Sequence, residues 1–138
     1  MSKILIVHTS WYEEYITKML GLSKKICEVY FQCSTAVAPG ALELSALAHH
    51  KISRENEEDK YIGILFLGIV IRGETSHYDL VTQETFRSIS SLASELPHLA
   101  IINNVICVEN LVQLEKRLMT NTENNTNALI ELINEKSS

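Results

Sequence analysis

Apolar residues along the chain follow two patterns, one typical of buried strands and one typical of amphipathic helices. Lys3–Thr9 contains an unbroken Ile-Leu-Ile-Val run, and Tyr61–Ile71 (YIGILFLGIVI) is apolar almost throughout. Runs of this kind are typical of strands that are buried on both faces of a parallel sheet. The segments between them carry apolar residues close to helical spacing, and polar stretches such as Ser53–Lys60 indicate exposed turns.

The order of these elements predicts an α/β fold. Strands are expected at Lys3–Thr9, Glu28–Thr35, Tyr61–Ile71 and Leu99–Val108, and helices at Tyr12–Ile26, Pro39–Ile52, Asp79–Leu96, Glu109–Met119 and Thr126–Lys136. The polar stretch Thr120–Asn125 is expected to separate the last two helices. Strands that alternate with helices form parallel sheets with right-handed crossovers. We therefore expect a flavodoxin-like three-layer sandwich with a four-stranded parallel sheet, formed by a single domain over residues 1–138.

Composition and charge exclude several classes of protein. The 138 residues are 46% hydrophobic and 21% charged, which is a globular composition that needs no disulfide or metal to fold. A net charge of −5 without a basic run makes nucleic acids and anionic membranes poor partners. The longest apolar stretch, Ile62–Ile71, is about half the length that crosses a bilayer, and no signal-peptide pattern is visible, so a cytoplasmic location is expected. Cys27, Cys33 and Cys107 form no CxxC pair, so they are interpreted as reduced thiols and no metal site is expected.

Ligands of open α/β sheets bind beyond the carboxyl ends of the strands. This rule points to the segments His8–Tyr12, Thr35–Glu43, Ile71–Tyr78 and Asn103–Val108. The third segment is the most informative, because Gly73 and the hydroxyl residues after it leave backbone N–H groups free for an anion at a helix start. His77 could exchange protons there near neutral pH. The alternative is an ordinary polar loop in which His77 caps the helix.

Three further side chains are candidates, each with a structural alternative. Glu43 could accept hydrogen bonds from ligand hydroxyls, or it could only complement a helix dipole. Trp11 could stack on a flat ring, or it could pack under a helix. Arg117 has no acidic residue four positions away on either side, so it is free to bind an anion unless it is only a solvated surface arginine.

Three motifs, in this order along the chain, resemble the 6,7-dimethyl-8-ribityllumazine synthase family. They are PGALEL (Pro39–Leu44), LGIVIRGETSHYDLV (Leu67–Val81) and VEN followed by Arg117. The resemblance implies that 5-amino-6-(D-ribitylamino)uracil condenses with 3,4-dihydroxy-2-butanone 4-phosphate, which yields the lumazine, phosphate and water in the penultimate step of riboflavin biosynthesis. It implies no metal and no organic cofactor.

The resemblance also implies a role for each site residue. It implies that His77 is the proton-transfer residue, that Trp11 stacks on the pyrimidine, and that Ile69 and Val70 lie along it. The ribityl chain would be held by Ala41, Leu42 and Glu43. The phosphate would be bound by Glu74, Thr75, Ser76 and Arg117. A ring of five chains, or a multiple of it, is implied, with Trp11, Glu43 and His77 from one chain and Asn103 and Arg117 from the next. Riboflavin synthase is a further candidate partner.

The chain departs from the family pattern at three positions. Asn103 stands where the family usually has a phenylalanine that covers the ring, Asn125 lies near the position of a phosphate-site lysine, and Ser45 replaces a helix-start proline. Asn103 and Asn125 favour the alternative of a non-catalytic flavin- or lumazine-binding protein, or a scaffold, with the same fold. A flavodoxin-like signalling receiver would need clustered aspartates, and the first strand ends instead in His8-Thr9-Ser10.

Overall fold

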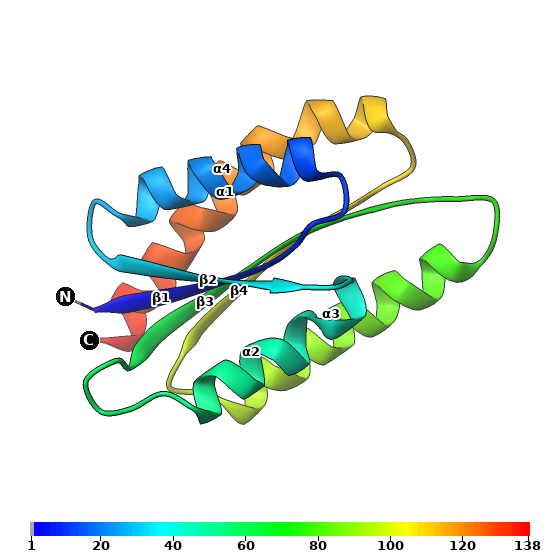
Figure 1. Ribbon diagram of the computed structural model, residues 1–138. Helices are drawn as coiled ribbons and strands as arrows, with labels where there is room; N and C mark the ends of the chain where they lie inside the picture. The colour runs from blue at the N-terminus through cyan, green and yellow to red at the C-terminus, as the bar shows by residue number, and fades with distance from the viewer. Residues whose placement is uncertain (1) are drawn as a thin grey trace.

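The computed structural model describes residues 2–138, which form a four-stranded parallel sheet between two layers of helices. The strands are β1 (Lys3–Thr9), β2 (Gln32–Ala38), β3 (Tyr61–Ile71) and β4 (Ala100–Val108). The helices are α1 (Glu13–Cys27), α2 (Leu44–Ser53), α3 (His77–Glu95) and α4 (Leu111–Lys136), with a short 3₁₀ helix, η1 (Ala41–Glu43), before α2. Figure 1 shows α1 and α4 on one face of the sheet and α2 and α3 on the other. The predicted flavodoxin-like three-layer fold is confirmed.

The strand order is β2-β1-β3-β4, and every neighbouring pair is parallel. From β1 the chain moves to one side to form β2, and then crosses to the other side of β1 to form β3 and β4. The winding direction therefore reverses between β1 and β3, and all carboxyl ends of the strands lie at one edge of the sheet. A reversal of this kind leaves a crevice beyond the strand ends, because the connections on its two sides lead away from each other.

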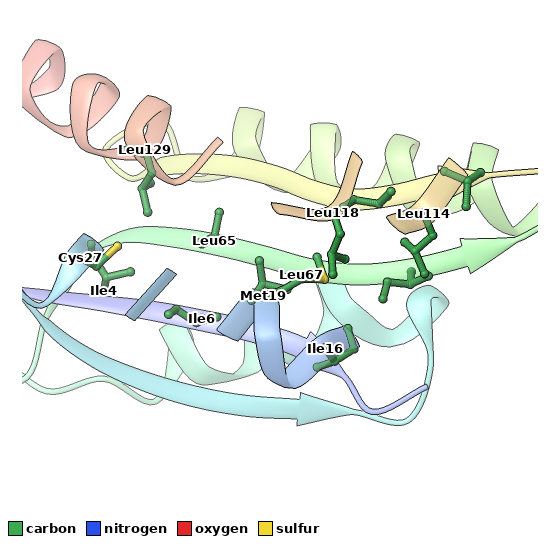
Figure 2. Packing of buried hydrophobic residues seen from close by; sticks show 14 of the residues in the cluster. Ile4, Ile6, Ile16, Met19, Cys27, Leu65, Leu67, Leu114, Leu118 and Leu129 are labelled. Atoms are coloured by element: carbon green, nitrogen blue, oxygen red, sulfur yellow. The ribbon is translucent and has the colours of Figure 1, made fainter. Parts of the chain in front are cut away.

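Two apolar clusters hold the three layers together, one on each face of the sheet. Alternate residues of a strand point to opposite faces, so the continuous apolar runs of β1 and β3 supply both clusters. Figure 2 shows the cluster under α1 and α4, which includes Ile4, Ile6, Met19, Leu65, Leu67, Leu114, Leu118 and Leu129. The cluster under α2 and α3 includes Leu5, Val7, Leu44, Phe66, Ile89 and Leu92.

Two element boundaries in the first half of the chain differ from the prediction. The second strand was expected at Glu28–Thr35, but the N–H groups of Tyr30 and Phe31 bond back to the carbonyl of Cys27 in a tight turn, so β2 begins at Gln32. The helix expected from Pro39 begins five residues later, because the backbone is extended at Gly40 and then forms η1. In both cases local turn hydrogen bonds override the propensity of the residues involved.

The expectation of two separate closing helices is wrong, since α4 runs unbroken over 26 residues. The polar residues that suggested a break are used inside the fold. Thr122 Oγ1 accepts a hydrogen bond of 3.0 Å from Asn104 Nδ2, and Asn125 Nδ2 donates to Asn104 Oδ1 over 2.7 Å. Thr126 Oγ1 lies 3.0 Å from Ser23 Oγ on α1. Buried polar side chains are tolerated when each has a partner, so this network permits a polar stretch within a packed helix.

No described helix, α4 included, combines the length and apolarity that crossing a bilayer would require.

All three cysteines are free thiols. Burial raises the pKa of Cys107 to about 11, so this thiol stays protonated near neutral pH. The thiols of Cys27 and Cys33 lie close enough to perturb each other, which raises the pKa of the buried Cys27 and lowers that of the half-buried Cys33.

Two buried threonines offer a matched test of the polar network. Thr122→Val removes the acceptor of Asn104 Nδ2 and leaves this buried NH₂ group without a hydrogen-bond partner, so we expect the free energy of unfolding to fall by about 1–3 kcal/mol. Thr85 is equally buried, and its hydroxyl has no partner within residues 2–138, so Thr85→Val should leave stability unchanged or raise it. Urea unfolding of both variants measures the difference. Equal losses in the two would contradict the role assigned to the network.

Candidate active site

A cavity of about 310 Å³ lies at the carboxyl edge of the sheet, where the winding direction reverses between β1 and β3. Three separate parts of the chain line it, together with the start of α3. The lining residues are Trp11, Tyr12, Gly40, Ala41, Leu42, Glu43, Ile69, Val70, Ile71, His77 and Val81. The rule for open α/β sheets therefore gives the location of the cavity from strand order alone.

The connection from β1 to α1 forms the first wall. Tyr12 has φ 59° and ψ 51°, a left-handed conformation that costs a residue with a side chain about 1 kcal/mol. Trp11 is 65% exposed, and its Nε1 donates a hydrogen bond of 3.0 Å to the carbonyl of Pro39. The alternative that Trp11 packs under a helix is therefore wrong. This bond ties the first wall to the second and leaves the indole ring open to a ligand.

Gly40 to Glu43 form the second wall. A Cβ atom at Gly40 would lie 3.1 Å from Glu43 Oε1, so the glycine makes room for this carboxylate. The Glu43 side chain does not cap α2, and it forms no ion pair with any residue of the described chain. Its oxygens are thus available to accept hydrogen bonds from a ligand, in addition to any effect on the helix dipole.

The end of β3 and the start of α3 complete the cavity. His77 is the first residue of α3, is exposed, and donates its backbone N–H to Thr75 Oγ1 over 3.2 Å. The loop before it, Gly73 to Ser76, is also exposed, and within residues 2–138 its backbone N–H groups donate to no backbone carbonyl. Free N–H groups at a helix start bind anions well, so the loop can accept a phosphate beside the imidazole.

The structure brings together most, but not all, of the residues singled out in the sequence. Seven of them line the cavity: Trp11, Ala41, Leu42, Glu43, Ile69, Val70 and His77. Glu74, Thr75 and Ser76 lie in the exposed loop next to it. Asn103 and Arg117 do not line it.

The positions of Asn103 and Arg117 explain why they are absent from the cavity. Asn103 pairs with Phe66, well before the end of β3, and its Oδ1 accepts a 2.8 Å hydrogen bond from the N–H of Val105. Arg117 is exposed on α4, in the helical layer opposite η1 and α3, and forms no ion pair with any described residue (Figure 1). Both side chains therefore lie outside the pocket of their own chain.

Four lining residues had no predicted role: Tyr12, Gly40, Ile71 and Val81. Val81 could have been found from helical spacing, since it follows His77 by four residues and shares its face of α3. Ile71 could have been found as the last residue of a strand whose two preceding residues were already assigned. The left-handed conformation of Tyr12 leaves no signal in the sequence.

An open parallel sheet with a mostly apolar cavity at the reversal point, and a histidine beside free helix-start amides, defines a flavodoxin-like α/β protein with a candidate ligand site at its carboxyl edge. The chain belongs to the 6,7-dimethyl-8-ribityllumazine synthase family, whose family model matches residues 1–137.

Several named relatives share this similarity. A 6,7-dimethyl-8-ribityllumazine synthase of Zymomonas mobilis is 36% identical over 112 residues, which cover 80% of this chain and 76% of the relative. Its counterpart of Agrobacterium fabrum is 36% identical over 114 residues, with the same coverage. That of Novosphingobium aromaticivorans is 33% identical over 115 residues, which cover 82% of this chain and 78% of the relative.

Trp11 is the chain's one tryptophan, so its fluorescence reports on the cavity. We expect a flat heteroaromatic probe, pteridine-2,4-dione, to quench the emission because it stacks on the exposed indole. Leu42→Lys, at an exposed rim position, should weaken the quenching. Val29→Lys makes the same kind of change at an exposed residue outside the cavity and should have no effect. Identical titrations for both variants would contradict binding in the cavity.

Proposed function

We propose that the chain is an active 6,7-dimethyl-8-ribityllumazine synthase, which condenses 5-amino-6-(D-ribitylamino)uracil with 3,4-dihydroxy-2-butanone 4-phosphate. The observation that carries the proposal is the meeting of Trp11, Glu43 and His77, from three separate segments, around one cavity. Each segment belongs to the family's expected site. The membership of the chain in the family supplies the chemistry that these residues would perform.

The pyrimidine substrate fits the apolar part of the cavity. Trp11 offers an exposed indole face on which a flat ring can stack, and Ile69 and Val70 supply an apolar surface along the ring. The ribityl chain would extend past Ala41 and Leu42, where the free oxygens of Glu43 can accept hydrogen bonds from its hydroxyls. In this arrangement the reacting amine of the pyrimidine would lie on the side of His77.

The phosphorylated ketone would bind at the loop before α3. Backbone N–H groups of Glu74, Thr75 and Ser76, together with the two hydroxyls, would surround the phosphate. A guanidinium binds phosphate through two parallel charge-assisted hydrogen bonds, and Arg117 would provide it. The carboxylate of Glu74 must point away from the phosphate, so this residue contributes through its backbone.

His77 would move the protons of the reaction. The amine attacks the ketone and the adduct loses water to form an imine, phosphate leaves, an enol forms and tautomerises to a second ketone, and the ring closes with loss of a second water. Each step transfers a proton, and one imidazole at the edge of the cavity can serve several of them in turn. Much of the remaining acceleration would come from holding the two substrates side by side.

A complete site would require a neighbouring chain. Arg117 and Asn103 lie outside the cavity of their own chain, and several apolar side chains are exposed on α3 and α4: Leu80, Phe86, Leu111, Val112 and Met119. Exposed apolar residues on two different helices suit a head-to-tail contact between identical chains, which closes into a ring. We propose a pentamer or a multiple of it, in which Arg117 of one chain faces His77 of the next.

One alternative has specific support, namely a member of the family that binds a flavin or lumazine without catalysis. Asn125 is engaged by Asn104, so it cannot replace the missing phosphate-site lysine, and Asn103 cannot cover the ring as a phenylalanine would. An assay with both substrates decides between the two functions. A fluorescent lumazine and free phosphate support the synthase; no product under conditions in which a control synthase works supports the binding protein.

Replacing His77 tests the proton transfer. His77→Ala should lower kcat by about 10²–10⁴-fold, because general acid–base catalysis contributes on that scale, while quenching of Trp11 by ligand persists. His98→Ala is the matched control, since His98 is also exposed but lies in the turn between α3 and β4. A His77→Ala rate within about threefold of the parent rate would rule out the proposed role.

Replacing Arg117 tests the shared site. Arg117→Ala should raise KM chiefly for the phosphorylated ketone; an equal loss for both substrates would contradict a phosphate-binding role. At a ketone concentration well below the raised KM, refolding an equal mixture of His77→Ala and Arg117→Ala chains should give more activity than either variant alone, because about one quarter of the sites in a mixed ring combine an intact His77 with an intact Arg117. The unmixed variants, refolded in the same way, are the controls. A mixture no more active than the average of the two variants would place both residues in the same chain's site.

A further inference from the structure

Arg72, the residue after β3, bonds to two other parts of the carboxyl edge. Its Nε donates to Glu109 Oε2 over 2.5 Å, and its Nη2 donates to Asp79 Oδ1 over 3.2 Å. The guanidinium carbon also lies 4.4 Å from the centre of the Tyr78 ring. One side chain thus connects the first turn of α3 with the turn between β4 and α4.

These bonds enclose the loop that precedes His77. Arg72 and Asp79 stand on either side of Gly73 to Ser76 and His77, so their ion pair closes the loop into a ring. Within the described chain the N–H groups of Gly73 to Ser76 donate no backbone hydrogen bond, and the loop is joined to α3 only at its end, where the Ser76 carbonyl accepts from the N–H groups of Asp79 and Leu80 and Thr75 Oγ1 accepts from that of His77. The Arg72 side chain is therefore the main side-chain connection between this loop, α3 and the turn between β4 and α4.

Glu109, the partner of Arg72 in the turn between β4 and α4, is itself held in place. The N–H of Glu109 donates to Gln113 Oε1 over 2.8 Å, and Asn110 caps α4 by accepting a 2.9 Å hydrogen bond from the N–H of Gln113. The N–H of Arg72 donates to the carbonyl of Val108 over 3.0 Å. Glu109 thus extends from a capped helix start, which makes it a fixed point to which a loop can be fastened.

Arg72 has a second effect, on the charges around the loop. Three carboxylates belong to this region: Glu74 lies in the loop that would receive a phosphate, and Asp79 and Glu109 both pair with Arg72, which directly precedes that loop. Asp79 and then Glu109 hold the pKa of Arg72 above its ordinary value, so the guanidinium remains charged. By pairing with two of the three carboxylates, it reduces the repulsion that an incoming anion would meet.

We propose that Arg72 is a positioning residue that ties the loop Gly73 to Ser76 to both α3 and the β4–α4 turn, and thereby presents the phosphate-binding amides and His77 in a fixed arrangement. The assignment of the loop to phosphate rests on the proposed function. The tether, by which we mean the bonds of Arg72 to Asp79 and Glu109 and its contact with Tyr78, rests only on the contacts of Arg72. Exposed ion pairs add little to global stability, so the effect of Arg72 lies in local order.

Amide hydrogen exchange tests the tether without any need for activity. Arg72→Gln should speed exchange in the segment from His77 to Leu80 about tenfold or more, because the hydrogen bonds from the N–H groups of His77, Asp79 and Leu80 to the loop can then open without breaking the two ion pairs of Arg72. Arg72→Lys keeps the charge but lacks the planar guanidinium that donates to both carboxylates at once. The same segment should therefore exchange nearly as fast in Arg72→Lys as in Arg72→Gln. Lys3→Gln is the matched control: Lys3 also combines an ion pair, with Asp59, and a cation–π contact, with Tyr61, outside the cavity.

Exchange in that segment within about twofold of the parent for Arg72→Gln, or a parent-like Arg72→Lys, would overturn the tether. An equal acceleration by Lys3→Gln would overturn it as well.

Kinetics test the consequence for binding. Arg72→Gln should raise KM for the phosphorylated ketone about tenfold or more and leave KM for the pyrimidine within about twofold; equal changes in both would overturn the proposal. A parent protein without synthase activity would mean that the proposed function fails. The tether is then judged by the exchange experiment, with inorganic phosphate as the binding probe in place of the ketone.

Discussion

The pairing of β1 with β3 is the constraint on which the rest of the structure depends. Because the chain winds away from this pair in both directions, the connections that follow β1 and β3 separate and leave their carboxyl ends uncovered. Trp11 follows one of these ends, and His77 follows the other after a short loop. The cavity is thus a product of topology, and the side chains around it determine only what it accepts.

The sequence predicted the sheet better than it predicted the turns. β1 and β3 are continuous apolar runs buried on both faces, and their predicted bounds agree with the structure. The errors lie where hydrogen bonds outweigh propensity, as at the tight turn after Cys27 and along α4, where polar residues are paired inside the fold. Side-chain partners of this kind come from distant segments, and no local pattern in the chain reveals them.

The site could be predicted in part for the same reason. Residues that directly follow β1 and β3 were found, because strand ends in a parallel sheet converge. The tether of Arg72 to Glu109 could not be found, since it joins residues 37 positions apart whose types are common on any surface. The roles of Asn103 and Arg117 rest on the resemblance to the family, because both side chains lie outside the pocket of their own chain and its geometry gives them no common ligand.

The network around Asn104 also constrains how this protein can change. Its amide is held by Thr122 on one side and Asn125 on the other, so a basic residue placed at position 125 would leave Asn104 Oδ1 buried without its present donor. Gaining a cation there demands a simultaneous adjustment at position 104. Because this bond joins the two positions, the effects of substitutions at them on stability are expected to be non-additive.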